Sequence, residues 1–165
     1  MFAGRHTAGT IRESANTLNA DYEDNYLVAA AWGKDVFMLG QGFSTGGEIG
    51  LAYRFGDSGS VELWGGISLR HRGVSILKAI TVSPAVTAGI SLTDKSIGAE
   101  HQRENGHNES ARILFYLGPE IAFSVSHHPR WELVYRLHHR SGGNRTLGNV
   151  LEGHNANTIG VRHRF

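Results

Sequence analysis

Two stretches alternate in polarity: WELVYRLHHRS, from Trp131 to Ser141, and the last nine residues, NTIGVRHRF, from Asn157 to Phe165. Successive side chains of a β-strand point to opposite faces, so this alternation predicts two β-strands. In the first strand, Trp131 and every second residue after it form a mostly apolar face that ends in His139 and Ser141. The apolar face of the second strand begins with Asn157. Each apolar face therefore carries polar and potentially reactive groups at one end.

The same alternation recurs along the rest of the chain. It runs through Gly46 to Phe55, Ser60 to Arg70, Ile80 to Leu92 and Ala111 to Ser126, with weaker signals at Ala3 to Ile11 and from Tyr26 onward. No run approaches the roughly 18 uninterrupted apolar residues of a membrane helix. Alternating segments of about ten residues separated by turns are typical of membrane barrels. The sequence predicts one all-β domain over residues 1–165: an eight-stranded, antiparallel, up-and-down transmembrane β-barrel.

The polar face of the predicted strands is rich in charges that balance one another. The alternation assigns residues to two faces, but it does not show whether water or lipid contacts each face. A soluble ligand-binding barrel with its apolar side inward is therefore an alternative. Small residues on the charged face favour a narrow interior, and a final Phe at the end of an alternating strand is common in outer-membrane barrels. The charged set comprises Glu48, Glu62, Glu120, Glu132, Arg54, Arg70, Arg112 and Arg136.

Loop lengths also favour the membrane barrel. Short connections near residues 39–45, 72–79 and 127–130 alternate with longer ones near 12–24, 93–110 and 142–156, as in barrels with short periplasmic turns and long outer loops. The short GDSG turn that begins at Gly56 is an exception on the outer side.

Three segments have less regular patterns. Arg12 to Asp24 is predicted as a polar loop, with a short amphipathic helix over Thr10 to Leu18 as the alternative. Pro84 lacks a main-chain N–H, so a bulge or local break in its strand is expected. Thr93 to Ser110 is hydrophilic and without period, and it is predicted as an exposed loop.

Composition narrows the class of protein. Lys and Arg number 16 against 15 Asp and Glu, a net charge of +1 that leaves no electrostatic footprint for nucleic acid. The absence of cysteine is compatible with passage through an oxidising periplasm. The first ten residues, MFAGRHTAGT, have no apolar core of a signal peptide, so a bacterial outer-membrane location requires that this chain be a mature or trimmed form.

A nucleophile and a base are predicted side by side on the first strand. His139 and Ser141 are two residues apart on one face, which places their Cα atoms about 7 Å apart. A serine needs an adjacent base, and the base needs a third group that fixes its tautomer, for which Asn157 is a candidate. The alternative is a non-catalytic one: polar residues at the end of a barrel strand usually only face the membrane–water interface. The remaining histidines show no metal-ligand spacing, and no metal is expected.

The segment RLHHRSGG, the Gly/Asn-rich loop after it and the closing strand NTIGVRHRF resemble the C-terminal part of the PagL-type lipid A 3-O-deacylases. Members of that family are outer-membrane enzymes with an eight-stranded barrel. Their His-x-Ser motif near the extracellular end of the penultimate strand matches His139 and Ser141. The resemblance implies an outer-membrane serine esterase that needs no cofactor, with lipid A of lipopolysaccharide as substrate and the lipid bilayer as its surroundings.

The chain departs from the family at two positions. Members often have an Asn with a proposed oxyanion role directly after the Ser, whereas this chain has Gly142, whose amide is one substitute and Asn144 another. The family's acid is a Glu at the start of the last strand, where this chain has Asn157, with Glu152 in the preceding loop as a displaced candidate.

Basic residues are expected to hold the phosphates of lipid A, namely Arg140, Arg145 and Lys34. The two departures also support a rival reading: a non-catalytic small outer-membrane barrel with a structural, lipid-binding or adhesion role. The sequence does not discriminate between these functions, and it leaves the oligomeric state open.

Overall fold

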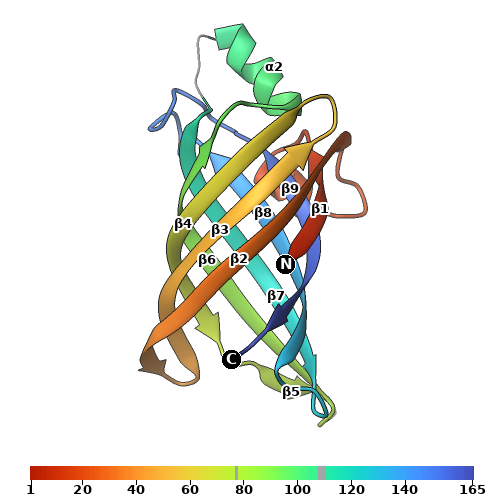
Figure 1. Cartoon of the computed structure of the whole chain (residues 1–165), viewed down its shortest axis with the longest axis vertical. Coiled ribbons are helices and arrows are strands. Elements are labelled where there is room, and N and C mark those ends of the chain that lie inside the picture. Colours follow the sequence, from red (N-terminus) through yellow and green to blue (C-terminus); the bar gives the residue numbers. More distant parts are fainter. Residues whose placement is uncertain (77, 108–110) are drawn as a thin grey trace.

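Eight antiparallel strands close into a ring (Figure 1). The computed structural model describes residues 1–76, 78–107 and 111–165. The elements are β1 (Phe2–Thr7), α1 (Ile11–Ala15), β2 (Tyr22–Gly40), β3 (Phe43–Phe55), β4 (Gly59–His71), β5 (Val74–Ile76), β6 (Ile80–Thr93), α2 (Gly98–His107), β7 (Ile113–Val125), β8 (Trp131–Ser141) and β9 (Asn155–His163). Strand β1 pairs with both β2 and β9, and β4 pairs with β6, which closes the ring. The predicted eight-stranded up-and-down barrel is confirmed; the short β5 is a ninth strand beside the start of β6.

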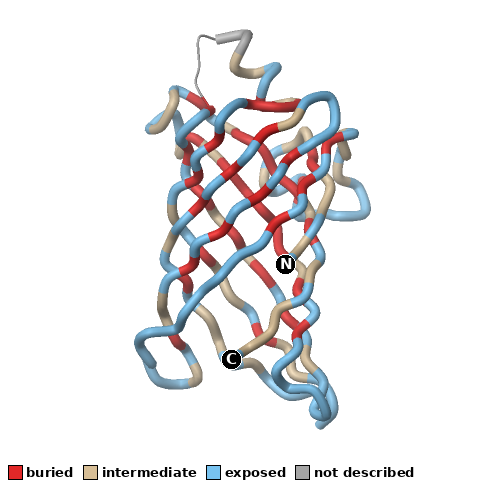
Figure 2. Tube along the Cα trace, viewed as in Figure 1, coloured by how far each residue is buried: buried red, intermediate tan, exposed pale blue. Residues whose placement is uncertain are grey.

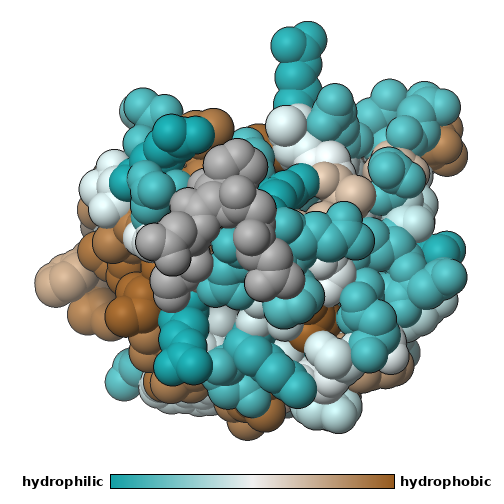
Figure 3. All heavy atoms as spheres, turned by 90° about the horizontal axis from the view of Figure 1, so that it is seen from above, coloured by the Kyte–Doolittle hydropathy of each residue, from teal (hydrophilic) through white to brown (hydrophobic). Residues whose placement is uncertain are grey.

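Apolar side chains lie outside the ring and charged ones inside. On β3, Ile49 and Leu51 are 52% and 55% exposed, whereas Arg54 is fully buried. Buried and exposed residues alternate along the strands in Figure 2, and the view from above in Figure 3 shows hydrophobic residues at the rim of a mainly hydrophilic end. A soluble barrel would have its apolar side inward, so that alternative is wrong.

Small residues make room in the interior for large ones. A Cβ atom at Gly50 would lie 2.0 Å from the ring of Trp64, which is 1% exposed. The indole N–H of Trp64 donates to Glu48 at 3.2 Å. Glycine and alanine on the charged face therefore allow a tryptophan to cross the narrow lumen.

The predicted charge pairing inside the ring is confirmed for most of its members. Arg136 is 3% exposed and binds the carboxylates of Glu48 at 2.6 Å and Glu120 at 2.6 Å. Buried charges require such partners, because the cost of removing them from water is otherwise several kcal/mol. Arg112 was also expected inside, but it is exposed at the rim, where β7 has not yet begun. The interior ion pairs also include residues that the prediction did not name, among them Glu100, Arg140 and Arg162.

The long connections gather at one end of the barrel and the C-terminus lies at the other (Figure 1). The helix alternative for residues 10–18 is confirmed in part, since Thr10 caps α1 with a capping box to Glu13. The prediction of an exposed loop over residues 93–110 is wrong for its described part: α2 lies over the end of the barrel, and its Glu100 is 1% exposed. Residues 108–110 of that prediction lie outside the described residues. Glu100 pairs with Arg54 and Arg140 inside the ring, and the spacing of residues along the sequence cannot predict such a long-range contact.

Pro84 interrupts pairing on one side of β6 alone. Pairing with β7 continues through Pro84, which lies opposite Ile121. On the other side, β6 pairs with β5 up to Val82 and with β4 from Ala85 onward. The missing N–H therefore coincides with the change of partner. No helix in the described part of the chain is long and apolar enough to cross a membrane.

Candidate active site

His139 and Ser141 project from the outer face of β8 near its end. The residues that alternate with them are bonded inside the ring: His138 to Glu62 at 2.9 Å, and Arg140 to Ser91 at 2.8 Å. Since neighbouring residues of a strand point opposite ways, His139 and Ser141 face outward, as the sequence predicts. His139 is only 6% exposed, and Ser141 is partly exposed.

The imidazole of His139 is held by Asn155, its direct partner on β9. Nδ1 of His139 donates to the carboxamide oxygen of Asn155 at 2.5 Å. The carboxamide nitrogen of Asn155 donates to the carbonyl oxygen of Gly9 at 2.7 Å, which fixes which end of the amide faces the ring. Nε2 is therefore the unprotonated nitrogen, and it forms no hydrogen bond with any residue that the structure describes.

Asn157, the predicted third group, does not reach His139. It lies opposite Leu137, one step further along the outer face. Its carboxamide oxygen accepts from the hydroxyl of Tyr135 at 2.6 Å, and its nitrogen donates to the carbonyl of Ser14 and to the hydroxyl of Tyr22. Asn157 thus links the segment that carries α1 to the outer wall, and Asn155 is the asparagine that contacts His139.

The turn after Ser141 requires glycine and presents free amides. A Cβ atom on Gly142 would lie 1.8 Å from the carbonyl oxygen of Val150. Gly143 has a φ of +59°, and its Cβ would lie 2.5 Å from the ring of Phe115. Within the described chain, the N–H groups of Gly142 and Gly143 donate no main-chain hydrogen bond. Two adjacent unpaired amides beside a serine are a candidate oxyanion hole.

The other two predicted polar residues lie in the loop between β8 and β9. Asn144 is exposed with a φ of +58°, and its side chain has no hydrogen bond to the described residues. Glu152 acts electrostatically on His139, and its Oε2 is buried without a hydrogen-bond partner. Among the described residues, no hydrogen bond or ion pair joins Glu152 to His139, and Asn155 holds the ring nitrogen.

The predicted phosphate contacts are corrected in two of three cases. Arg140 is 1% exposed and points into the lumen, because it occupies the inward position between His139 and Ser141. Lys34 lies in the second half of β2, toward the end of the barrel that is opposite to Ser141. Of the three, only Arg145, in the loop after Ser141, is both exposed and at the same end of the barrel as the candidate site.

Sequence reasoning missed Asn155 and Gly9. Asn155 has the same strand parity as Asn157, so alternation admits either as the partner of His139. The strand begins at Asn155 rather than Asn157, and only the pairing register with β8 places it opposite His139. Gly9 contributes a main-chain carbonyl, which has no signal in the sequence. In the parts of the chain that the structure describes, no cluster of three His, Asp or Glu side chains is arranged to hold a metal ion.

Comparisons with known proteins add one structural likeness. No protein-family model matches the chain, and no curated protein matches it. A solved structure described as the crystal structure of the outer membrane enzyme PagL superposes with a TM-score of 0.64 at 11% sequence identity, over 99% of this chain and 97% of that one. At this identity the likeness shows the fold: the chain has the barrel architecture of PagL.

Proposed function

We propose that this protein is an outer-membrane serine esterase that removes an ester-linked acyl chain from lipid A. The observation that carries the proposal is the hydrogen-bonded series Gly9, Asn155 and His139, which leaves Nε2 of His139 free to act as a base toward Ser141. A buried base with a fixed tautomer, beside an outward-facing serine, is the arrangement that nucleophilic ester hydrolysis needs.

The chemistry proceeds in two steps. The Ser141 hydroxyl attacks the ester carbonyl and gives its proton to Nε2 of His139, and the amides of Gly142 and Gly143 stabilise the tetrahedral oxyanion. The intermediate then collapses: the bond between the carbonyl carbon and the sugar oxygen breaks, and the protonated His139 gives its proton to that oxygen, which leaves as a hydroxyl. Water next gives a proton to His139 and attacks the acyl-enzyme; the bond to the Ser141 oxygen breaks, His139 returns the proton to that oxygen, and the fatty acid leaves. Glu152, in the loop between β8 and β9, supplies the negative charge that stabilises the imidazolium in this proposal.

The outer surface of the barrel explains why the site faces outward. An apolar outer wall with a charged and filled lumen suits a bilayer. Ser141 is the last residue of β8, before the long connection to β9, and this end of the barrel is the one expected to lie where acyl chains meet polar head groups. Arg145 is the remaining candidate for contact with a lipid A phosphate. The likeness to PagL supports the outer-membrane setting of the proposal.

The test is mass spectrometry of lipid A from bacteria that express the protein or its Ser141→Ala variant, followed by the purified proteins with lipid A in detergent. We expect loss of one acyl chain with the wild-type protein and none with the variant, at equal amounts of folded barrel. Identical acyl patterns in both strains would end the esterase proposal. They would instead favour a non-catalytic barrel. The presence of Asn155 rather than an acidic residue beside His139 is the observation that favours this second function.

A further inference from the structure

We infer that Glu100 of α2 is a positioning residue that sets the geometry of His139 and Ser141 from inside the barrel, through Arg140. The inference rests on the proposed esterase function and extends it to a helix that has no contact with the reacting atoms. It makes activity dependent on how α2 is docked in the end of the barrel.

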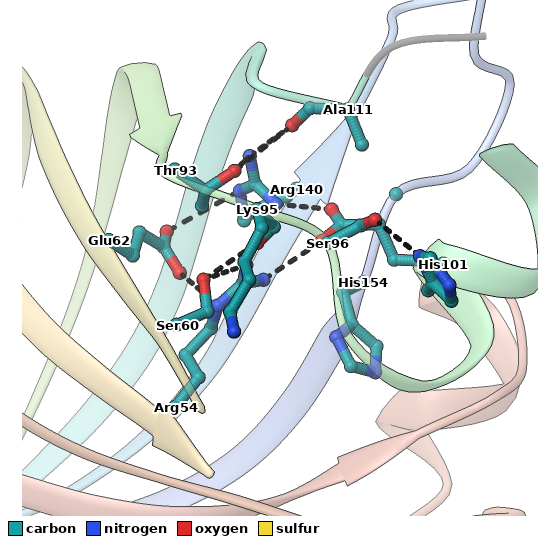
Figure 4. A network of polar contacts seen from close by, with 12 residues as sticks. Arg54, Ser60, Glu62, Thr93, Lys95, Ser96, His101, Ala111, Arg140 and His154 are labelled. Atoms are coloured by element: carbon teal, nitrogen blue, oxygen red, sulfur yellow. Dashed lines mark hydrogen bonds and ion pairs between the residues drawn. The ribbon is translucent and has the colours of Figure 1, made fainter. Parts of the chain in front are cut away.

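Arg140 is the inward-facing residue between the proposed base and nucleophile. Its Nε donates to the hydroxyl of Ser91 at 2.8 Å, and Nη2 donates to the carbonyl of Ala111 at 2.7 Å. Its Nη1 binds a carboxylate oxygen of Glu100. Figure 4 shows the side chain among Thr93, Ala111 and Glu62. The guanidinium group is thereby held by β6, α2 and the segment before β7 at once, so the main chain at Arg140 has little freedom.

Glu100 is shared by two arginines. One carboxylate oxygen accepts from Arg140 and the other from Nη1 of Arg54 at 2.9 Å, and the side chains of all three are at most 1% exposed. Glu62 contributes a second negative charge 3.6 Å from Arg140. The two carboxylates thus balance the two guanidinium groups, and neutralising Glu100 would leave both buried arginines with Glu62 as their one remaining carboxylate among these residues.

The main chain carries this restraint to the other half of the site. The N–H of Arg140 donates to the carbonyl of His154 at 2.9 Å, and the N–H of Gly153 donates to the carbonyl of Arg140 at 3.0 Å. These bonds set the register of β8 against the segment that leads to Asn155. From α2, Arg103 also donates to the carbonyls of Gly153, at 2.6 Å, and Ala8. The helix therefore contacts the segments that present Asn155 and Gly9.

The decisive comparison is between Glu100→Gln and Glu48→Gln. Both replace a lumenal carboxylate that faces an arginine of β8 with a neutral amide, but Glu48 pairs with Arg136, further from Ser141. A misplacement of about 1 Å costs on the order of 100-fold in rate, so kcat of Glu100→Gln should fall by roughly 10- to 100-fold. KM should be unchanged, since Glu100 does not touch substrate. In Glu48→Gln, kcat should stay near the wild-type value.

Two further measurements keep the inference falsifiable. Arg140→Lys keeps the positive charge but loses the guanidinium N–H groups that donate to Ser91 and Ala111, so it should lower kcat in the same way. Heat-modifiable migration on a denaturing gel shows whether each variant is folded. Amide hydrogen exchange at Arg140 and Ser141 should be faster in Glu100→Gln than in Glu48→Gln. Equal kcat values for Glu100→Gln and wild type, or equal exchange in both variants, would overturn the inference. An inactive wild-type protein would refute the proposed function instead, and the exchange comparison would still decide whether Glu100 anchors β8.

Discussion

The carboxamide oxygen of Asn155 lies 2.5 Å from Nδ1 of His139 across the pairing of β8 and β9. An asparagine in place of the acid of a serine triad can be very costly, because its NH₂ group can face the histidine and impose the wrong tautomer. Here the carbonyl of Gly9 accepts from that NH₂ group. The neutral residue thus selects the productive tautomer, although it adds no charge to stabilise the imidazolium.

We expect Asn155→Leu to lower kcat by about 10³- to 10⁴-fold, the order seen when a triad histidine loses its tautomer control. KM should change little, because Asn155 orients the base and does not hold the substrate. The measurement is ester hydrolysis under saturating substrate. Asn157→Leu is the matched control: it has the same residue type on the same face of β9, but it bonds Tyr135 and not His139. A loss in the control as large as in Asn155→Leu would contradict this assignment.

The orientation of the barrel predicts how its outer wall tolerates charge. Leu51 is 55% exposed on the outside of β3, and Leu51→Arg should destabilise the protein by about 2–4 kcal/mol if the residue lies near the bilayer midplane. Urea titration of folding into lipid vesicles measures this cost. Asp57→Arg, in the exposed turn after β3, is the control and should be tolerated. An equally small cost at both positions would argue against a lipid-facing wall.

The ion pairs inside the lumen should matter far more than those outside. Arg136→Met leaves the buried carboxylates of Glu48 and Glu120 without their shared partner, so the free energy of unfolding should fall by about 3–5 kcal/mol. Arg5→Met breaks a pair with Asp24, in which the side chains are 42% and 92% exposed, and one hydrogen bond to the carbonyl of Glu23, and it should cost about 1–2 kcal/mol. Chemical denaturation of both variants tests the difference, and comparable losses would refute it.

The capping box of α1 should respond to acid. Hydrogen bonds from the main-chain N–H of Thr10, and then from its hydroxyl, hold the pKa of Glu13 below its ordinary value. A lowered folded-state pKa means that ionised Glu13 stabilises the fold at neutral pH and that this contribution is lost as pH falls through the lowered pKa. Thr10→Ala removes the hydroxyl donor, so the pKa of Glu13 should move back up. An NMR titration of the Glu13 carboxyl measures its pKa in the wild-type protein and in Thr10→Ala. An unchanged pKa in the variant would contradict the capping geometry.

The alternation of polar and apolar residues was sufficient to predict the strands of the barrel and the face on which each side chain lies. Because the side-chain period of a strand is two, the sequence places Leu51 and Arg54 on opposite faces, and it places His139 and Ser141 on the apolar one. It could not place residues 98–107, where a helix with little apolar periodicity is held by the buried charge of Glu100. It also could not separate Arg112 from the lumenal arginines, because burial at the end of a strand depends on where pairing stops.

By itself, then, the sequence determined the strands, the two faces and the pair of His139 and Ser141, since all three follow from local spacing along one strand. Which residue completes the site was decided by tertiary structure. Asn155 and Asn157 are two residues apart and therefore lie on the same face of β9. The hydrogen-bond register between β8 and β9 places Asn155, rather than Asn157, opposite His139. The carbonyl of Gly9, 146 residues away in the chain, then fixes its amide, a contact that exists only because the ring closes between β1 and β9.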